Sequence, residues 1–394
     1  MLACLLVLAL AGLAQAQQQL YEGSKCETAA GAPGICKRLT SCPWAVEEVK
    51  RGRRPKICFL QGPWPFACCP GTSATTPAPA ASSAAQVAAV GVRGRVAKSK
   101  CEEYAEYVFA EVDSPVLMLA TERQDLCARS VDPLIVGGSL AKAMEFPHMA
   151  LIGYGDEPSI DWLCGGSLIS KNFVLTAGHC LVAGDREARW VLLGELDYST
   201  EADDAQPQRL RIAQTFKHPG YRPPSTYNDI ALLRLERNAR MSGYVRPACL
   251  YTEPTLRPRA GNEKDELPVA TGWGNTDWVG DASSHLLKVA LRVSEPAACK
   301  KAFSSVTKIK LPQGINTEMQ LCAGGSGLDT CQGDSGGPLQ VAPKNYSRDS
   351  VEPYCMWKIV GITSFGQACG GGGVYSRVYH FLPWIEGIVW PGGE

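Results

Sequence analysis

The sequence predicts an all-β fold with one C-terminal helix, preceded by a small module that disulfides hold together. Short apolar runs of Val, Ile and Leu, interrupted by Gly and Pro, recur from Ile135 to Glu394, which is typical of short strands. Apolar residues then recur at three- and four-residue spacing from Val378 to Val389, which indicates a helix whose first turn would hold Pro383. Six of the 17 cysteines lie between Cys26 and Cys69, a density typical of a disulfide scaffold.

The amino terminus predicts a secreted protein. Leu2 to Leu13 is apolar but too short to span a membrane, and Ala14-Gln15-Ala16 has the small-x-small pattern that signal peptidase cuts. Residues 1–16 are therefore the expected signal peptide, and no later segment is expected to cross a membrane. Removal of Cys4 leaves an even number of cysteines, as expected for complete pairing in an oxidising compartment.

Composition excludes some partners and divides the rest of the chain. Lys plus Arg and Asp plus Glu both number 39, so net charge gives no general attraction to nucleic acid, and we expect no nucleic-acid partner. The cysteine-rich module covers residues 26–69, and residues 70–134 form a linker and tail. In the first part of residues 70–134, Pro70 to Lys100 is mostly Ala, Ser, Thr, Pro and Gly, which predicts a flexible linker. Residues 135–394 form the main domain.

Three motifs in the main domain carry catalytic residue types. His179 lies in Thr-Ala-Gly-His-Cys, where a neighbouring cysteine can tether its loop. Asp229 precedes an apolar strand, where its carboxylate can be buried under an imidazole. Ser335 lies in Gly-Asp-Ser-Gly-Gly-Pro, whose glycines let backbone N–H groups converge on one point. A serine hydroxyl needs a nearby base before it becomes a good nucleophile at neutral pH, and these motifs supply one.

These three motifs, in this order, resemble the chymotrypsin-family (S1) serine proteases along essentially all of residues 135–394. The resemblance implies two six-stranded antiparallel β-barrels with a C-terminal helix. It makes Ser335 the nucleophile, His179 the proton carrier and Asp229 the residue that orients the imidazole. The amides of Gly333 and Ser335 would form the oxyanion hole. Gly178 stands where the family more often has Ala, a difference of one methyl group that is not expected to remove activity.

The same resemblance implies a preference for basic substrates. Asp329, six residues before Ser335, matches the carboxylate at the floor of the primary pocket in trypsin-like members. A carboxylate there favours Arg or Lys before the scissile bond. Ser364, Gly366 and Gly373 are the expected pocket walls.

The start of the main domain resembles the family's activation sequence. Cleavage before Ile135 would free an ammonium group that pairs with Asp334, the residue before the nucleophile. The residue before this bond is Leu134, which a pocket with an acidic floor should not accept. We therefore expect a zymogen activated by an upstream protease of non-trypsin specificity.

The N-terminal module resembles the clip domain of arthropod serine proteases, with metal binding as the alternative role for its cysteines. The two resemblances together imply six disulfides: Cys26–Cys68, Cys36–Cys58, Cys42–Cys69, Cys164–Cys180, Cys299–Cys322 and Cys331–Cys369. The remaining cysteines allow three pairings. Cys249 matches the position that usually retains the light chain, so we expect Cys127 with Cys249 and Cys101 with Cys355. This arrangement most resembles the Snake-like subgroup.

The expected function is that of a trypsin-like protease zymogen in an immune, melanization, Toll-type or developmental cascade. Its substrate would be another protease zymogen, cleaved after Arg or Lys, and serpin-type inhibitors are expected partners. The alternatives are a catalytically silent clip-domain cofactor, although no triad residue is missing, and a digestive trypsin, which would not need the clip module. No cofactor is expected for the chemistry. Glu195, Asp203 and Asp204 could form a calcium loop or a solvated acidic surface, and Asn345 lies in a glycosylation sequon.

Overall fold

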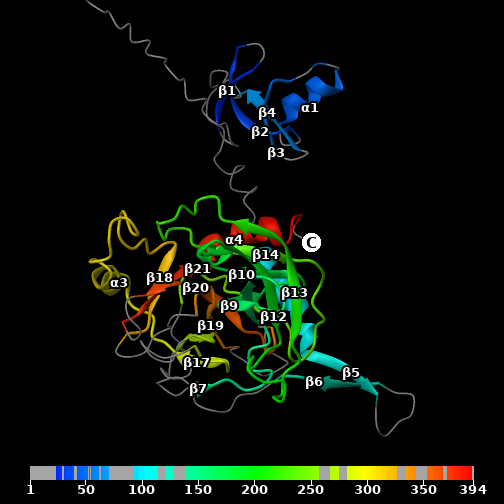
Figure 1. Cartoon of the computed structure of the whole chain (residues 1–394), viewed down its shortest axis with the longest axis vertical. Coiled ribbons are helices and arrows are strands. Elements are labelled where there is room, and N and C mark those ends of the chain that lie inside the picture. The colour runs from blue at the N-terminus through cyan, green and yellow to red at the C-terminus, as the bar shows by residue number, and fades with distance from the viewer. Residues whose placement is uncertain are drawn as a thin grey trace, which may run out of the picture. The chain divides into compact units, whose positions relative to one another are not determined.

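The structure is a computed structural model. It describes residues 24–28, 31–39, 42–51, 53, 55–61, 64–70, 93–113, 121–127, 139–256, 267–274, 282–325, 334–342, 353–366 and 371–392. The chain forms two compact units, residues 1–84 and 85–394 (Figure 1). Several expected features lie outside the described residues: the signal peptide 1–16, Leu134, Ile135, Asp329, Gly333, Asn345, Cys331 and Cys369. In the described part of the chain, none of the helices has the length and apolar character needed to cross a bilayer.

The N-terminal unit is a four-stranded antiparallel sheet with one helix. Its elements are β1 (Lys25–Glu27), β2 (Pro33–Arg38), α1 (Pro43–Lys50), β3 (Ile57–Gln61) and β4 (Trp64–Pro70). The sheet order is β1-β2-β4-β3. Its small core brings Cys42 and Ala45 at the start of the helix against Ala67 of β4, so few apolar side chains hold the fold together. Disulfides therefore supply much of the constraint in this unit.

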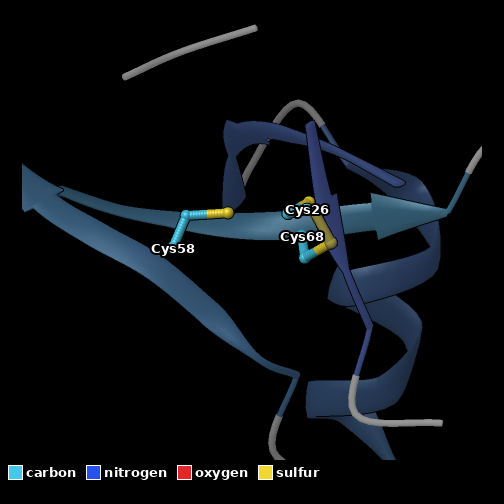
Figure 2. A group of neighbouring side chains, drawn as sticks. All are labelled: Cys26, Cys58 and Cys68. Atoms are coloured by element: carbon cyan, nitrogen blue, oxygen red, sulfur yellow. A yellow bond between two sulfur atoms is a disulfide. The ribbon is translucent and has the colours of Figure 1, made fainter. Parts of the chain in front are cut away.

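Three disulfides cross-link the N-terminal unit in the expected pairs, Cys26–Cys68, Cys36–Cys58 and Cys42–Cys69. Figure 2 shows the sulfur of Cys26 bonded to that of Cys68, with Cys58 nearby. The sulfur atoms of these three residues lie within 4.8 Å of one another, a spacing that would suit a metal ion. All three are consumed in disulfides, so they offer no thiolate to a metal.

The first sheet of the main unit closes into a barrel. Its strands are β8 (Met149–Tyr154), β9 (Asp161–Leu168), β10 (Phe173–Thr176), β11 (Val182–Ala183), β12 (Arg186–Leu193), β13 (Gln208–Lys217) and β14 (Ala231–Leu235). The order is β11-β12-β13-β14-β10-β9-β8, and β12 also pairs with β8, which closes a ring of six antiparallel strands. Apolar side chains such as Ile152, Leu168 and Val191 are fully buried inside it. This is the first of the two expected barrels.

The second sheet holds the other six main strands. They are β16 (Val269–Gly272), β17 (Leu287–Ala290), β18 (Gln320–Ala323), β19 (Pro338–Val341), β20 (Lys358–Gly366) and β21 (Gly373–Arg377). Two short strands join them: β7 (Ser139–Leu140) pairs with β17, and β15 (Cys249–Leu250) runs parallel to β20. The path runs β18-β21-β20-β19-β16-β17-β7 and remains open among the described residues. The short helix α3 (Pro296–Ala302) precedes β18 and is attached to it by the Cys299–Cys322 disulfide.

The C-terminal helix α4 (Val378–Val389) follows β21 without a break. Val378, Phe381, Leu382 and Ile385 pack into the core, as their spacing predicts. Pro383, expected in the first turn, instead lies inside the helix. Its ring removes one backbone donor, but burial of this apolar stripe offsets the missing hydrogen bond.

The segment before the expected activation site is folded onto the main unit, so the flexible linker expected to reach Lys100 ends earlier. Helix α2 (Arg95–Tyr104) is followed by the 3-10 helix η2 (Ala105–Val108) and by the hairpin of β5 (Phe109–Asp113) and β6 (Thr121–Asp125). Ala97, Cys101 and Tyr104 form the buried stripe of α2. The Glu386 carboxylate of α4 accepts the Ala97 N–H at 2.9 Å. The average composition of residues 70–100 gave no sign of the helical spacing of the buried residues in α2.

The two disulfides that join residues 85–134 to the two barrels differ from the expected pairs. Cys101 is bonded to Cys249, and Cys127 to Cys355, so the two expected partners are exchanged. The reason is the placement of α2, which packs beside β15 and brings Cys101 to Cys249. The hairpin then leads Cys127 to Cys355, where Phe109 stacks on Tyr354 and Asp125 accepts the Tyr354 hydroxyl at 2.7 Å. Figure 1 shows the β5–β6 ribbon extending away from the barrels.

Candidate active site

His179 and Asp229 are brought together by two neighbouring strands of the first barrel. His179 lies in the 3-10 helix η3 (Gly178–Leu181), directly after β10, and Asp229 lies just before β14, which pairs with β10. The disulfide Cys164–Cys180 anchors the histidine loop to β9. The potential ligand atoms of Cys164, His179 and Cys180 lie within 4.8 Å of one another. They do not form a metal site, because the two sulfurs are bonded to each other.

The Asp229 carboxylate is buried and fully supplied with donors. It is 2% exposed. Its Oδ1 accepts the His179 backbone N–H at 2.9 Å, and its Oδ2 lies 2.8 Å from His179 Nδ1. The Ser364 hydroxyl donates a third hydrogen bond to Oδ2. Three donors offset the desolvation of the carboxylate, and the contact to Nδ1 places the imidazole proton there, leaving Nε2 free to accept one.

Asp229 is held in place by its neighbours along the chain. Asn228 adopts a positive φ of 56°, a conformation that Asn tolerates better than most residues, and its side-chain amide donates to the Gly220 carbonyl at 3.2 Å. The Ser376 hydroxyl donates to the Asp229 carbonyl at 2.6 Å. The sequence motif located the aspartate, but these supports come from strands and loops distant in the chain.

The pKa of His179 reflects a balance of opposing effects. Burial lowers it, but the hydrogen bond and negative charge of Asp229 outweigh burial, and the pKa is raised above its usual value. The His179 side chain is 32% exposed, so it remains accessible to a substrate. A base of this kind can take a proton from a serine hydroxyl and return it to a leaving amine.

Ser335 lies between the two sheets. Its carbonyl accepts the Gly165 N–H of β9 at 2.8 Å, and the following Gly336 N–H donates to the Thr363 carbonyl of β20 at 2.9 Å. Gly336 has φ +78°, and a Cβ there would lie 2.2 Å from Thr176 Oγ1, so only glycine fits. Cys180, the residue after His179, has its sulfur 3.5 Å from the Ser335 carbonyl. The nucleophile motif is thus next to the histidine loop.

Asp334 occupies a niche made by two glycines. Its Oδ1 accepts the Gly274 N–H at 3.0 Å. A Cβ on Gly272 would lie 2.1 Å from Oδ1 of Asp334, and one on Gly274 would lie 2.6 Å from its carboxyl carbon. The carboxylate therefore lies directly against the backbone at the end of β16, and residues with side chains at these glycine positions would displace it.

The expected pocket walls lie on β20 and β21. Gly366 pairs with Gly373 across these strands, which leaves a strip without side chains. Ser364, expected as a wall, has its hydroxyl turned to Asp229. The roles of Ser364 and Ser376 as supports of the aspartate were missed from the sequence, because an isolated serine in a strand gives no signal of a partner more than a hundred residues away.

The acidic loop that holds Glu195, Asp203 and Asp204 lies outside this site. Two of its carboxylates are bonded within the loop, since Glu195 accepts the Leu196 N–H and Asp203 accepts the Asp197 N–H, both at 2.9 Å. Asp204 accepts the hydroxyl of Tyr244, which lies outside the loop. Burial is the main cause that raises the pKa of Glu195, and the nearby charge of Asp203 adds to it.

Comparisons with known proteins agree with this geometry. The trypsin family model matches residues 135–385. The chain is 35% identical to serine protease snk of Drosophila melanogaster over 94% of this chain and 79% of that protein. It is 36% identical to the CLIP domain-containing serine protease HP8 of Bombyx mori over 69% of this chain and 73% of that one. It is 35% identical to the Spaetzle-processing enzyme of Drosophila melanogaster over 66% of this chain and 68% of the relative. The chain therefore belongs to the trypsin family of serine endopeptidases, as one of its clip-domain members.

Proposed function

We propose that the chain is a secreted protease zymogen, cut between Leu134 and Ile135, that then cleaves other proteins after Arg or Lys in a proteolytic cascade. The observation that carries the catalytic part is the buried Asp229 carboxylate bonded to His179 beside the Ser335 loop. This arrangement is built for acyl transfer.

The chemistry follows from these three residues. His179 Nε2 takes the proton of the Ser335 hydroxyl while Ser335 Oγ attacks the scissile carbonyl. Asp229 stabilises the resulting imidazolium. The imidazolium then donates that proton to the leaving amine, and water repeats the sequence to release the acyl group. The Ser335 and Gly333 amides hold the oxyanion in this proposal. No metal or cofactor takes part in these steps.

The activation step is supported by the position of Asp334. Gly272, against which its carboxylate lies, pairs with Leu287 of β17, and Leu287 pairs with Leu140 of β7. Two strand spacings separate Gly272 from Leu140, about 10 Å. The five residue steps from Leu140 back to Ile135 span up to about 17 Å when the chain is extended, so a freed Ile135 amine can reach Asp334.

Leu134 and Asp329 together indicate that this protease acts downstream of another protease in a cascade. An acidic pocket floor at Asp329 selects basic side chains, so the mature enzyme does not cut after Leu134 and a different protease activates it. The disulfides Cys101–Cys249 and Cys127–Cys355 would keep the clip module attached after the cut. One relative is named for processing Spaetzle, and a protein or zymogen cut after Arg or Lys is the corresponding substrate class here. Serpin-type inhibitors would complete the regulation.

Secretion, glycosylation at Asn345 and a calcium loop at Glu195 belong to the same proposal. Secretion is supported by the seven disulfides among the described cysteines, since such bonds persist in oxidising compartments. The calcium loop is supported by Glu195, which is half-buried and whose pKa is raised by burial. A bound cation would offset the cost of burying this carboxylate, which would serve as an oxygen ligand.

Cleavage of the Leu134→Arg zymogen tests the proposal. Purified Leu134→Arg protein should activate itself and hydrolyse arginyl and lysyl amides, whereas the parent should remain inert until another protease cuts it. The Ser335→Ala variant of the same protein should be secreted normally and stay inactive. A cut Leu134→Arg protein that prefers leucyl or phenylalanyl amides would contradict the assignment of Asp329. No activity at all after verified cleavage would favour the silent cofactor.

A further inference from the structure

A buried ion pair lies next to β7, the strand that follows the proposed activation site, and takes no part in the catalytic chemistry. Lys288 Nζ lies 2.6 Å from Glu145 Oε1 and 2.9 Å from its Oε2, and the two side chains are only 4% and 5% exposed. Buried ion pairs seldom stabilise a protein more than apolar residues of the same size would. Their better documented role is to fix one register or arrangement among several, so the position of this pair in the sheet matters.

The two partners adjoin β7, the first described strand of the protease domain. Lys288 is on β17, where it pairs with Ser139 of β7. Glu145 follows β7 in the loop to β8, and its Oε2 also accepts the Lys142 N–H at 2.9 Å. Its backbone carbonyl accepts the Trp357 indole N–H at 2.8 Å. The ion pair therefore ties the first turn after β7 to the strand with which β7 pairs.

Among the described residues, few contacts besides this pair hold β7 in register. It is a two-residue edge strand, and its one apolar residue, Leu140, is 59% exposed. The next residue, Ala141, is buried and donates its N–H to the Leu286 carbonyl at 2.8 Å. A burial pattern is what usually fixes strand register, and one small buried residue fixes it only weakly, so the strand can slip. A slip of one residue would move β7 by about 3.3 Å along β17. The Ile135 amine would then be displaced by about the same distance from its place on Asp334.

We propose that the Glu145–Lys288 ion pair sets the register of β7 against β17, and so aims the freed Ile135 amine at Asp334. The two residues are positioning residues for zymogen activation, and they touch neither the substrate nor the triad. This inference rests on the proposed activation at Ile135. In this proposal, the ion pair determines the fraction of cleaved molecules in which the Ile135 amine is inserted.

The test measures insertion of the amine directly. The Leu134→Arg protein is cut with immobilised trypsin, the new Ile135 terminus is verified by sequencing, and its carbamylation by cyanate is followed by mass spectrometry. In the Glu145→Gln/Lys288→Met double variant, which replaces the pair by neutral residues of similar size, the amine should be carbamylated about tenfold faster. Its kcat should fall in proportion to the loss of inserted molecules, with KM unchanged, because only molecules with the amine inserted are competent. Lys288→Arg, which keeps the charge, should behave nearly as the parent.

The exposed pair Arg189–Asp156 provides a matched control, since its side chains are 54% and 73% exposed. The Arg189→Met/Asp156→Asn variant should leave carbamylation and kcat unchanged. A double variant at Glu145 and Lys288 that is labelled as slowly as the parent, with the parent's kcat, overturns the register proposal and leaves the proposed function standing. If the double variant is not secreted, Glu145→Gln alone carries the same expectations. Cut parent protein labelled as fast as a free Ile-Val-Gly-Gly peptide overturns the activation mechanism as well.

Discussion

Gly178→Ala is the substitution whose effect the geometry of the active site defines most clearly. A Cβ at Gly178 would lie 2.8 Å from Tyr221 Cδ1, 3.1 Å from its Cε1 and 3.2 Å from its Cγ. Carbon atoms normally approach to about 3.5 Å, so the buried Tyr221 ring must move. Overpacking of this kind costs about 1–3 kcal/mol. The sequence alone treated the missing methyl as harmless, whereas the structure shows that the Tyr221 ring already fills its place.

The expected result is a loss of both stability and activity. At about 2–4 °C per kcal/mol, the melting temperature should fall by about 2–12 °C. A shift of the backbone at residue 178 also disturbs the adjoining His179, so kcat should fall by up to about tenfold. Thermal denaturation and hydrolysis of an arginyl amide by the cut Leu134→Arg protein measure the two effects.

Two variants make this prediction specific. Gly387→Ala, in α4, meets no atom within 4 Å and should leave the protein as stable or slightly more so. Tyr221→Leu combined with Gly178→Ala should recover part of the loss, because the shorter side chain makes room for the methyl. A Gly178→Ala protein within about 0.5 kcal/mol of the parent, with the same kcat, would refute the reasoning.

The remaining predictions concern ionisation, the disulfides and a cation. Because Asp229 raises the pKa of His179, activity should fall as pH drops through that raised pKa, and Asp229→Asn should move this acid limb to lower pH and reduce kcat by orders of magnitude. A raised pKa in the folded state also means that the pair stabilises the protein below the unfolded histidine pKa of about 6.5 and loses this contribution as pH rises through the raised pKa. Melting temperatures of parent and Asp229→Asn protein should therefore converge at alkaline pH. Cys127→Ser should free the thiol of Cys355 for alkylation, and a free Cys249 would contradict the pairing. Calcium at 1 mM, about the extracellular level, should raise the melting temperature over EDTA by a few degrees in the parent but not in Glu195→Gln, and equal values would exclude a calcium loop there.

The sequence predicted those features that depend on local motifs. The short apolar runs correspond to strands of two sheets, and the apolar spacing from Val378 to Val389 corresponds to α4. His179 and Asp229 were identified from motifs whose glycine, cysteine and apolar neighbours suit a tethered loop and a buried carboxylate. The three clip disulfides also follow the expected pairs, which the resemblance to the clip domain implied.

Features that depend on packing between distant segments were not predictable in the same way. The exchange of partners between Cys101 and Cys127 depends on where α2 lies, and four cysteines with three possible pairings contain no information about that. The hydrogen bond from Ser364 to Asp229 joins residues 135 positions apart. Nothing in the sequence singles out Lys288, and only its pairing with Glu145 beside β7 shows why it is buried.

The central claim is that cleavage before Ile135 completes a working site around one serine, and labelling with a phosphonofluoridate inhibitor tests it most directly. The cut Leu134→Arg protein should bind one inhibitor per molecule at Ser335, and its Ser335→Ala variant should bind none. The uncut parent should react at least a hundredfold more slowly under the same conditions. Equal labelling of cut and uncut protein, or labelling at a residue other than Ser335, would contradict the account.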